Sequence, residues 1–544
     1  MNKKIIYISD FFAEQIIGGA ELNDKELIDI LSSKYEVLKI NSHLVTEGFI
    51  EQNKDCFFII SNFINLDYDC REKLFNTNYV IYEHDHKYVK GRNPGVFKDF
   101  VVDQSKIINF YFYKNANKVF CQSKFHKDII QKNLQTDNIF NLSGNLWSVS
   151  DLELMRKLGK SEKEEKASIL DSSIHHKNTK GAILFCENKN LKYDLIKSSN
   201  YQDFLKMMAK NKKFVFLPRT PETLSRIVVE ARMLGCSVIS NQLVGATYEE
   251  WFKLKGEELI DYLLQKRENI FNIFDKLIST PQQKNERPLV SIITTFYKAE
   301  EFLEQYLESI IKQTIFSSCE IILIDTASPG KERQICNKFA AKYKNIKYTR
   351  FEKRLTPTEG FNIALKFANG KYICWSHPDD RKSLDNIKIL CNELQNNDKI
   401  DLVYGNCLVT KNKNENFEEC QSKTLFEHSL NDFSKENMIK CLPGPMPMHT
   451  TRMIDKIGFL DNKNQNFSDD WEFYLRAVDH GLSFKKVNKV VGSYLVGGRS
   501  QMDNNLEQRQ EEARLFYRYR HLFGKNFNVY EPYFKQFIGL INDK

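Results

Sequence analysis

Apolar runs of strand length alternate with amphipathic stretches along most of this chain. Near the N-terminus, IIYIS is followed by a loop, by the amphipathic stretch ELNDKELIDILSSKY and then by EVLKI. The same order returns around CFFIIS, NYVIYEHD and KVFCQS. Strands that are separated by helices pair in parallel, and the helices cover the faces of the resulting sheet. The alternation therefore predicts an α/β fold with mostly parallel sheets.

The length of the chain requires more than one core. It has 544 residues, whereas a single hydrophobic core stops growing beyond about 250–300 residues. We predict a Rossmann-like domain at residues 1–150 and a shorter one at 151–280, with strands at KASILDSS, GAILFCE, KFVFLP and CSVISN. The polar stretch 281–288, with two prolines, has the character of a linker. A third domain is predicted at 288–544, and its tail LFYRYRHLF is expected to form a closing amphipathic helix or, alternatively, a membrane-facing one.

Bulk properties narrow the class of protein. The net charge of +8 is a small difference between 79 basic and 71 acidic residues, so it gives only weak support for a nucleic-acid partner. The 12 cysteines are scattered without CxxC spacing, as expected for reduced thiols in a cytoplasmic protein. No apolar stretch approaches the roughly 20 residues that span a bilayer. We expect a soluble chain that is at most peripherally attached to the inner face of a membrane.

Acidic residues follow strand-like segments of the third domain. Asp325 ends EIILID, residues 377–380 follow KYICWS, and Asp469 and Asp470 precede the helical WEFYLRAVDHG. In open α/β sheets, ligands bind beyond the carboxyl ends of the strands. Carboxylates there suit a magnesium or manganese ion that carries a diphosphate, and a separate carboxylate can accept a proton from an attacking hydroxyl.

Structural roles compete with this interpretation. Asp380 precedes RKSLDNIKIL and is a candidate helix N-cap, as is one of Asp469 and Asp470. His377 is a candidate for a hydrogen-bonded structural residue as well as for a metal ligand.

Residues 289 to about 500 resemble the family 2 glycosyltransferases, which have the GT-A fold. The stretch LVSIITTFYKAEEFLEQYLESIIKQ is similar to their first strand and helix, and EIILIDTASPG is similar to the segment that grips the nucleotide. FNIALKFANGKYICWSHPDD is similar to the approach to their metal motif, and SDDWEFYLRAVDHG to the segment that carries the base. The resemblance implies an inverting transferase that uses a nucleoside diphosphate sugar.

The same resemblance assigns roles to individual residues. It implies that Thr295 and Tyr297 lie near the nucleobase and that Asp325 contacts the nucleoside. Asp379 takes the place of the metal-binding aspartate, with Mn²⁺ or Mg²⁺ as the implied cofactor, and Asp470 takes that of the general base.

The sequence departs from the family pattern at two positions. Thr326 stands where a second acidic residue of the nucleotide grip is usual, and His377 stands where the metal motif has its first aspartate. Neutral imidazole can bind manganese, but one negative charge is lost. The resemblance implies Asp379 and, as a second candidate, His377 as the metal ligands, and the alternative is that the enzyme has lost its dependence on a metal.

The first half contains a second candidate site. In PETLSRIVVEARMLG, Glu222 and Glu230 lie eight residues apart, a spacing that places both on similar faces of one helix. A helix N-terminus near Pro221 would direct its backbone amides toward a phosphate. The structural alternative makes Glu222 a first-turn acid and Glu230 a surface residue.

The stretch YEHDHKY, at the end of a strand, is a candidate acceptor-side site, and a metal site is an alternative for it.

Residues 3 to about 250 resemble, more loosely, GT-B glycosyltransferases of the family 4 type. The resemblance rests on the two glutamates, on the turn LGCSVISN and on the glycine loop GGAE. It implies that Glu222 contacts the donor sugar, that Glu230 contacts the ribose, and that Gly18 and Gly19 let the backbone approach the substrate. The candidates for a diphosphate clamp are Lys177, Lys180 and Arg219.

The predicted function is a bifunctional glycosyltransferase that adds sugars to a surface glycan or lipid-linked oligosaccharide. The expected partners are a nucleoside diphosphate sugar and that glycan or lipid-linked acceptor, and the choice of acceptor rests on fold analogy. A DNA-base glycosyltransferase of viral type is an alternative, although no basic stripe with interleaved aromatic residues supports it. A further alternative keeps one active GT-A domain and makes the first half a non-catalytic binding module.

Overall fold

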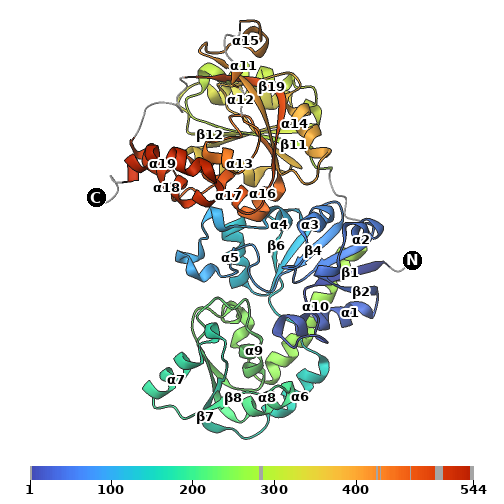
Figure 1. Cartoon of the computed structure of the whole chain (residues 1–544). Coiled ribbons are helices and arrows are strands. Elements are labelled where there is room, and N and C mark those ends of the chain that lie inside the picture. Colours follow the sequence, from blue (N-terminus) through green and yellow to red (C-terminus); the bar gives the residue numbers. More distant parts are fainter. Residues whose placement is uncertain are drawn as a thin grey trace. The chain divides into compact units, whose positions relative to one another are not determined.

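The computed structural model describes residues 3–280, 286–423, 427–428, 431–465, 467–496 and 506–538. The chain forms two compact units (Figure 1). Unit 1 consists of Met1–Val102 and Phe110–Lys284, and unit 2 of Asp103–Asn109 and Asn285–Lys544. Most of the expected linker at 281–288 lies outside the described residues.

The first sheet of unit 1 has six parallel strands in the order β2-β1-β3-β4-β5-β6. They are β1 (Lys4–Ser9), β2 (Glu36–Asn41), β3 (Phe57–Ile60), β4 (Asn78–Tyr82), β5 (Lys118–Cys121) and β6 (Ile139–Asn141). This is a doubly wound order, and the central strands are apolar because helices cover both of their faces. The helices between the strands are α1 (Gly19–Ser32), α2 (Glu47–Gln52), α3 (Tyr68–Leu74), α4 (Phe110–Asn115) and α5 (Lys124–Leu134).

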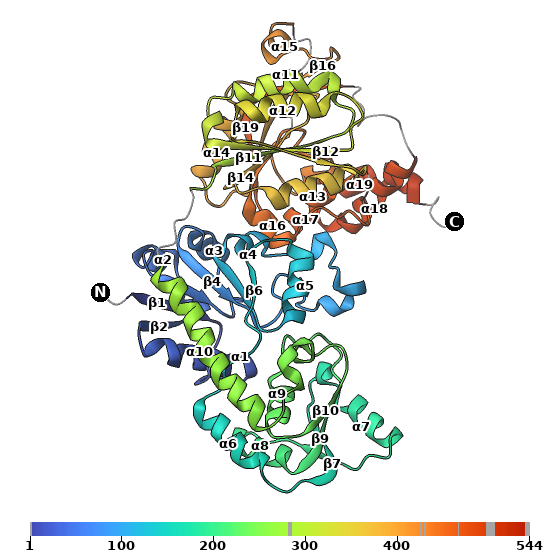
Figure 2. The same ribbon diagram turned by 180° about the vertical axis from the view of Figure 1, so that it is seen from behind.

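The second sheet of unit 1 has four parallel strands in the order β10-β9-β7-β8. They are β7 (Glu164–Leu170), β8 (Tyr193–Ile196), β9 (Asn211–Phe216) and β10 (Ser237–Ser240). Their helices are α6 (Val149–Gly159), α7 (Thr179–Asn188), α8 (Tyr201–Ala209) and α9 (Arg226–Met233). The long α10 (Glu257–Ser279) packs on both cores, with Leu263 in one and Phe274 in the other (Figure 2).

Two local predictions for this region are wrong. The stretch GAILFCE is not a strand but part of α7, where Ala182 and Cys186 are buried at helical spacing. A short apolar run does not distinguish a strand from one face of a helix. The helix expected from Pro221 begins only at Arg226, because Ser225 has a φ of 72°. Glu222 therefore does not share a helix with Glu230, and instead forms a parallel bridge with Val244.

Unit 2 is built on a nine-stranded sheet with a parallel half and a mixed half. The main order is β13-β12-β11-β14-β18-β16-β19-β15, and β17 pairs with β16. The parallel half consists of β11 (Val290–Phe296), β12 (Cys319–Thr326), β13 (Ile346–Phe351) and β14 (Tyr372–Trp375). The remaining strands are β15 (Arg381–Lys382), β16 (Leu402–Thr410), β17 (Glu427–His428), β18 (Met448–Thr450) and β19 (Phe484–Leu495).

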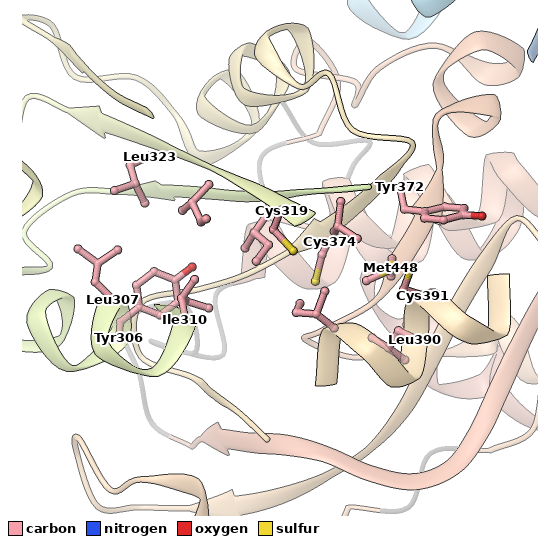
Figure 3. Close-up of a cluster of buried hydrophobic side chains, with 14 of the residues drawn as sticks. Tyr306, Leu307, Ile310, Cys319, Leu323, Tyr372, Cys374, Leu390, Cys391 and Met448 are labelled. Atoms are coloured by element: carbon pink, nitrogen blue, oxygen red, sulfur yellow. The ribbon is translucent and has the colours of Figure 1, made fainter. Parts of the chain in front are cut away.

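Helices cover both faces of the unit 2 sheet (Figures 1 and 2). One face carries α11 (Glu300–Ile311), α12 (Glu332–Lys342) and α14 (Asn386–Gln395). Figure 3 shows part of the core on this face, where Leu307 and Ile310 of α11 and Leu390 of α14 pack with Cys374 of β14. The other helices are α13 (Pro357–Phe367), α15 (Phe417–Lys423), α16 (Thr451–Ile457), α17 (Asp469–Asp479), α18 (Leu506–Arg518) and α19 (Lys525–Ile538).

The prediction of an α/β fold with mostly parallel sheets is confirmed. Within the described residues, none of the helices combines the length and the apolar character needed to cross a bilayer.

Candidate functional site

The expected nucleobase side of unit 2 lies at the carboxyl ends of β11 and β12. Thr295 packs against α13, where a methyl group on Gly360 would come within 2.1 Å of the Thr295 hydroxyl. The guanidinium of Arg354 lies 3.8 Å from the centre of the Tyr297 ring. The same guanidinium donates from Nη1 to Thr326 Oγ1 at 2.5 Å. Thr326, which stands where the family has an acid, therefore anchors an arginine over Tyr297.

Asp325 is fully buried at the end of β12 and is already hydrogen-bonded. Its Oδ1 accepts from the amide of Ser328 at 2.8 Å. Its Oδ2 accepts from the Tyr348 hydroxyl at 2.8 Å and from Arg350 Nη1 at 2.7 Å. These bonds neutralise the carboxylate and fix the loop that follows β12. A contact from Asp325 to a nucleoside stays a prediction.

The expected metal ligands follow β14. His377 and Asp379 are half-buried, and the burial of His377 lowers the pKa of its imidazole, while the charges of Asp379 and Asp470 raise it. A neutral imidazole is the form that binds a metal. The described residues contain no group of three or more His, Cys, Asp or Glu side chains that could hold a metal ion. Binding of a cation by His377 and Asp379 stays a prediction.

Asp380 is not a helix cap. The next helix, α14, begins at Asn386 with Asp385 at its N-cap. Asp380 is instead buried, and its Oδ1 accepts from the amide of Leu495 at 3.3 Å. Burial, together with the neighbouring Asp379, raises the pKa of Asp380 well above its usual value.

Asp469 and Asp470 occupy the first turn of α17, after Ser468 at the N-cap. Asp470 Oδ1 accepts from the Trp471 amide at 2.6 Å, and the thiol of Cys441 donates to Asp470 Oδ2 at 3.4 Å. Burial raises the pKa of Asp470, and these two hydrogen bonds partly offset that rise. Burial and the charge of Asp470 raise the pKa of Asp469 to about 6. Neither aspartate stands at the N-cap position itself.

Helix α13 joins the nucleobase side to the aspartates of α17. It begins with Pro357 and a capping box between Thr356 and Glu359, which is a strong helix start. Besides its contact with Thr295, α13 presents Thr358, whose hydroxyl donates to Asp469 Oδ2 at 2.7 Å. Asn362 adds two hydrogen bonds of 3.0 Å to the backbone of Leu460. The end of β11 and the start of α17 are therefore attached to one helix.

A cavity of about 400 Å³ lies beside this edge of the sheet, lined by Lys298, Glu300, Glu301, Pro329, Gly330 and Glu332. The acids there have structural partners. Glu332 Oε1 accepts from the Glu300 amide at 3.2 Å, and Glu300 Oε2 accepts from the Lys331 amide at 3.1 Å. Each carboxylate thus lies at the N-terminus of the other's helix, where negative charge is stabilising. Asp325, Asp379 and Asp470 do not line this cavity.

In unit 1, the glycine loop lies against the N-terminus of α9. A methyl group on Gly18 would come within 2.3 Å of Glu21 Oε2, and one on Gly19 would lie 3.4 Å from Arg226 Cδ. Arg226 is buried, donates to the Leu146 carbonyl at 2.5 Å and stacks on Trp147. The structure therefore brings together the loop and the helix that the family 4 resemblance expects at one site.

The two glutamates of unit 1 are held by internal partners. Glu222 Oε1 pairs with Lys177 Nζ at 2.8 Å. Glu230 is 2% exposed, and its Oε1 accepts from Trp147 Nε1 at 3.0 Å and from the Tyr201 hydroxyl at 2.8 Å. Glu230 is therefore not a surface residue, and Arg226 Nε lies 3.6 Å from the same oxygen.

The candidate clamp residues lie near the carboxyl ends of β7 and β9. Arg219 donates from Nε to Asn178 Oδ1 at 3.0 Å and from Nη1 to His175 Nε2 at 2.5 Å. Lys180 is exposed in the first turn of α7. Their contact with a diphosphate stays a prediction.

The residues of YEHDHKY have separate partners. His84 Nε2 contacts Asp24 Oδ1 at 2.7 Å. Lys87 Nζ binds the buried Glu83 Oε1 at 2.6 Å and the partly exposed Asp85 Oδ1 at 2.7 Å. Burial lowers the pKa of His86 to about 4. This cluster stabilises the end of β4, and its acceptor-side role stays a prediction.

Three residues near the expected site of unit 2 were not anticipated: Arg354, Thr358 and Cys441. The only sequence signal for Arg354 is a basic residue in the loop between a strand and a helix. Thr358 lies within a sequence that already reads as a helix start, and Cys441 has no distinguishing neighbour. Tertiary contacts, rather than local pattern, bring them to this site.

Comparisons with known proteins agree on the class of enzyme. Residues 291–459 match the profile described as Glycosyl transferase family 2. The chain is 26% identical over 234 residues to an uncharacterized glycosyltransferase of Methanocaldococcus jannaschii, which covers 43% of this chain and 78% of that protein. It is 39% identical over 92 residues to the minor teichoic acid biosynthesis protein GgaB of Bacillus subtilis, which covers 16% of this chain and 10% of GgaB. TarS 1–349 of S. aureus, solved in complex with UDP, shows 16% identity and a TM-score of 0.35, covering 45% of this chain and 72% of TarS 1–349.

The profile match includes β11 to β14, and therefore Thr295, Tyr297, Asp325 and Asp379, whereas Asp470 lies beyond its end. The chain spans only a tenth of GgaB. The C-terminal half of the chain thus carries a region that matches Glycosyl transferase family 2, and the enzyme class that these comparisons indicate is glycosyltransferase.

Proposed function

We propose that unit 2 transfers a sugar from a nucleoside diphosphate sugar to a hydroxyl group of a glycan, with inversion at the anomeric carbon. The observation that carries this proposal is the arrangement around α13. The helix contacts Thr295 through Gly360 and holds Asp469 through Thr358. One rigid element therefore supports both the donor side and the base side of the site.

The nucleotide is proposed to lie across the carboxyl ends of β12, β11 and β14. Its base would meet Tyr297 and Arg354, and its diphosphate would point toward Asp379. Neighbouring strands are about 4.8 Å apart, so the step from β12 to β14 is about 10 Å, comparable with the length of a nucleoside diphosphate. Asp379 and His377 would hold the Mn²⁺ or Mg²⁺ ion, which would neutralise the diphosphate as it leaves.

Asp470 is the proposed general base. It would accept the proton of the acceptor hydroxyl while the hydroxyl oxygen attacks the anomeric carbon from the face opposite the diphosphate. Burial raises the pKa of Asp470, which makes its carboxylate a better proton acceptor than an exposed aspartate. A positioned base contributes roughly 10²–10⁴-fold to the rate. We take the acceptor to be a surface glycan or lipid-linked oligosaccharide, since the relative GgaB is named for teichoic acid biosynthesis.

For unit 1 we propose a non-catalytic glycan-binding module in preference to a second transferase. The burial of Glu230 and its bonds to Trp147 and Tyr201 support this choice, because a ribose-binding carboxylate has to be accessible. The pairing of Glu222 with Lys177 supports it as well.

Separate Asp470→Asn and Glu222→Gln variants test both proposals. Transfer is measured with a panel of labelled nucleotide sugars and a glycan acceptor. We expect Asp470→Asn to lose transfer by at least about 10²-fold and Glu222→Gln to retain it. An active Asp470→Asn enzyme would refute the assigned base. Loss of a distinct sugar transfer in Glu222→Gln would instead establish a bifunctional enzyme.

A further inference from the structure

The start of α17 is held by a carboxylate from the C-terminal helices. Glu511 of α18 is 2% exposed, and its Oε1 accepts from the amides of Phe467 and Ser468 at 3.0 and 2.7 Å. These amides directly precede Asp469 and Asp470. At this helix start the carboxylate of α18 therefore acts as the cap, since the side chain of Ser468 forms no capping bond.

A second contact joins α18 and its following turn to the body of α17. The hydroxyl of Tyr519 donates to Glu472 Oε1 at 3.0 Å, and Glu472 is itself paired with Arg476. Glu472 and Tyr519 are both buried. The contact gives α18 and its following turn a second attachment to the start of α17.

Helix α19 reaches the residue next to the proposed base. Phe534 stacks on Trp471 with ring centres 6.3 Å apart, and Trp471 Nε1 donates to the Met438 carbonyl at 2.8 Å. Asn526 of α19 donates to the Glu436 carbonyl in the same short turn as Met438. Figures 1 and 2 both show α18 and α19 beside α17.

We infer that Glu511 is a positioning residue of the transferase, and that α18 and α19 are part of its catalytic module rather than an accessory tail. This inference rests on the proposed role of Asp470. By holding the amides of residues 467 and 468, Glu511 fixes where the first turn of α17 begins and hence where the Asp470 carboxylate lies. Both helices lie beyond residue 459, where the family profile ends.

The test compares Glu511→Ala with Glu511→Gln in the full chain. Glu511→Ala removes both acceptor bonds, and we expect kcat to fall about 10–100-fold, the effect of a small misplacement of a reacting group. Donor KM should stay within about twofold, because the nucleotide side is not attached to α18. Glu511→Gln keeps an acceptor oxygen and should therefore retain most of the kcat of the unchanged enzyme. Hydrogen–deuterium exchange of amides 467–471 should rise in the alanine variant only.

Glu507, which is exposed on the same helix, provides the matched control. Glu507→Ala should leave kcat, KM and amide exchange unchanged. Normal kcat and normal exchange in Glu511→Ala would overturn the inference. If that variant fails to fold, Glu511→Asp decides, because the shorter side chain withdraws the carboxylate from both amides. Its kcat should fall at least tenfold, and an unchanged kcat would overturn the inference.

Asp470→Asn, assayed in parallel, separates this inference from the proposed function. An active Asp470→Asn variant refutes the proposed base itself. An inactive Asp470→Asn variant beside a fully active Glu511→Ala variant refutes only the positioning role.

Discussion

The acidic residues of the two units differ in their burial and in the partners that bind them. In unit 1, Glu230 and Glu83 are buried and bound by protein donors. In unit 2, Asp379 is half-buried, and Asp470 is held by one amide and one thiol. Strong internal partners stabilise a carboxylate and reduce its capacity to bind a further ligand. The difference supports chemistry in unit 2 and a structural role for most acids of unit 1.

The largest expected effect is a loss of stability at the buried ion pair of unit 1. Lys87→Met would leave Glu83 without its cation in the interior of the fold. Removing one partner of a buried ion pair costs about 3–5 kcal/mol, so we expect a loss of that size in the free energy of unfolding of unit 1. Chemical denaturation followed by a unit 1 probe measures it.

The control is Lys25→Met, which removes a lysine from an exposed pair with Asp29. That change should cost less than about 0.5 kcal/mol. Equal stability of the two variants would mean that the cluster around Lys87 is open to water, and unit 1 would then have free acids like those of unit 2.

The second prediction concerns the metal ligands of unit 2. Asp379→Asn removes the carboxylate beside His377, and we expect transfer to fall about 10²-fold, a cost typical of losing one stabilising group at a developing charge. Titration with Mn²⁺ should show weaker stimulation in the variant than in the unchanged enzyme. Activity that resists chelation and survives Asp379→Asn would mean that this site works without a cation.

The third prediction concerns Arg354, which lies over Tyr297 and is anchored by Thr326. Arg354→Ala should raise the KM for the donor about tenfold with little change in kcat, because it removes a contact made equally in the ground and transition states. Lys353→Ala, one residue earlier and exposed, is the matched control. A fall in kcat with unchanged KM would place Arg354 near the reacting atoms instead of the nucleobase.

The sequence was sufficient for features that depend on local pattern. Strand and helix alternation predicted the sheets of both units, and strand-end acids predicted where Asp325 and Asp379 lie. The sequence was insufficient where the backbone conformation of one residue decides where a helix begins. Ser225 has a positive φ, and α9 therefore begins only at Arg226. The sequence also could not reveal that Asp325 is bound by Tyr348 and Arg350, because those partners come from a neighbouring strand. Pairing across a sheet is set by packing, not by spacing along the chain.

The smallest expected effect is at Cys441, whose thiol donates to Asp470 Oδ2. Because that hydrogen bond lowers the pKa of Asp470, Cys441→Ala should raise it. The base must be ionised to accept a proton, so activity is lost as pH falls through its pKa. The acid limb of the kcat profile should therefore move to higher pH in Cys441→Ala, with a rate loss of about fivefold at most, equivalent to one hydrogen bond of ~1 kcal/mol.

At alkaline pH the Cys441→Ala variant and the unchanged enzyme should converge, since Asp470 is ionised in both. Cys441→Ser keeps a donor at the same position and should leave the acid limb where it was or move it to lower pH. A pH-independent loss of rate in Cys441→Ala would mean that the thiol acts by packing rather than by charge. An unchanged profile would mean that Asp470 is held by the Trp471 amide alone, and the base of unit 2 would then have fewer partners than Glu230 in unit 1.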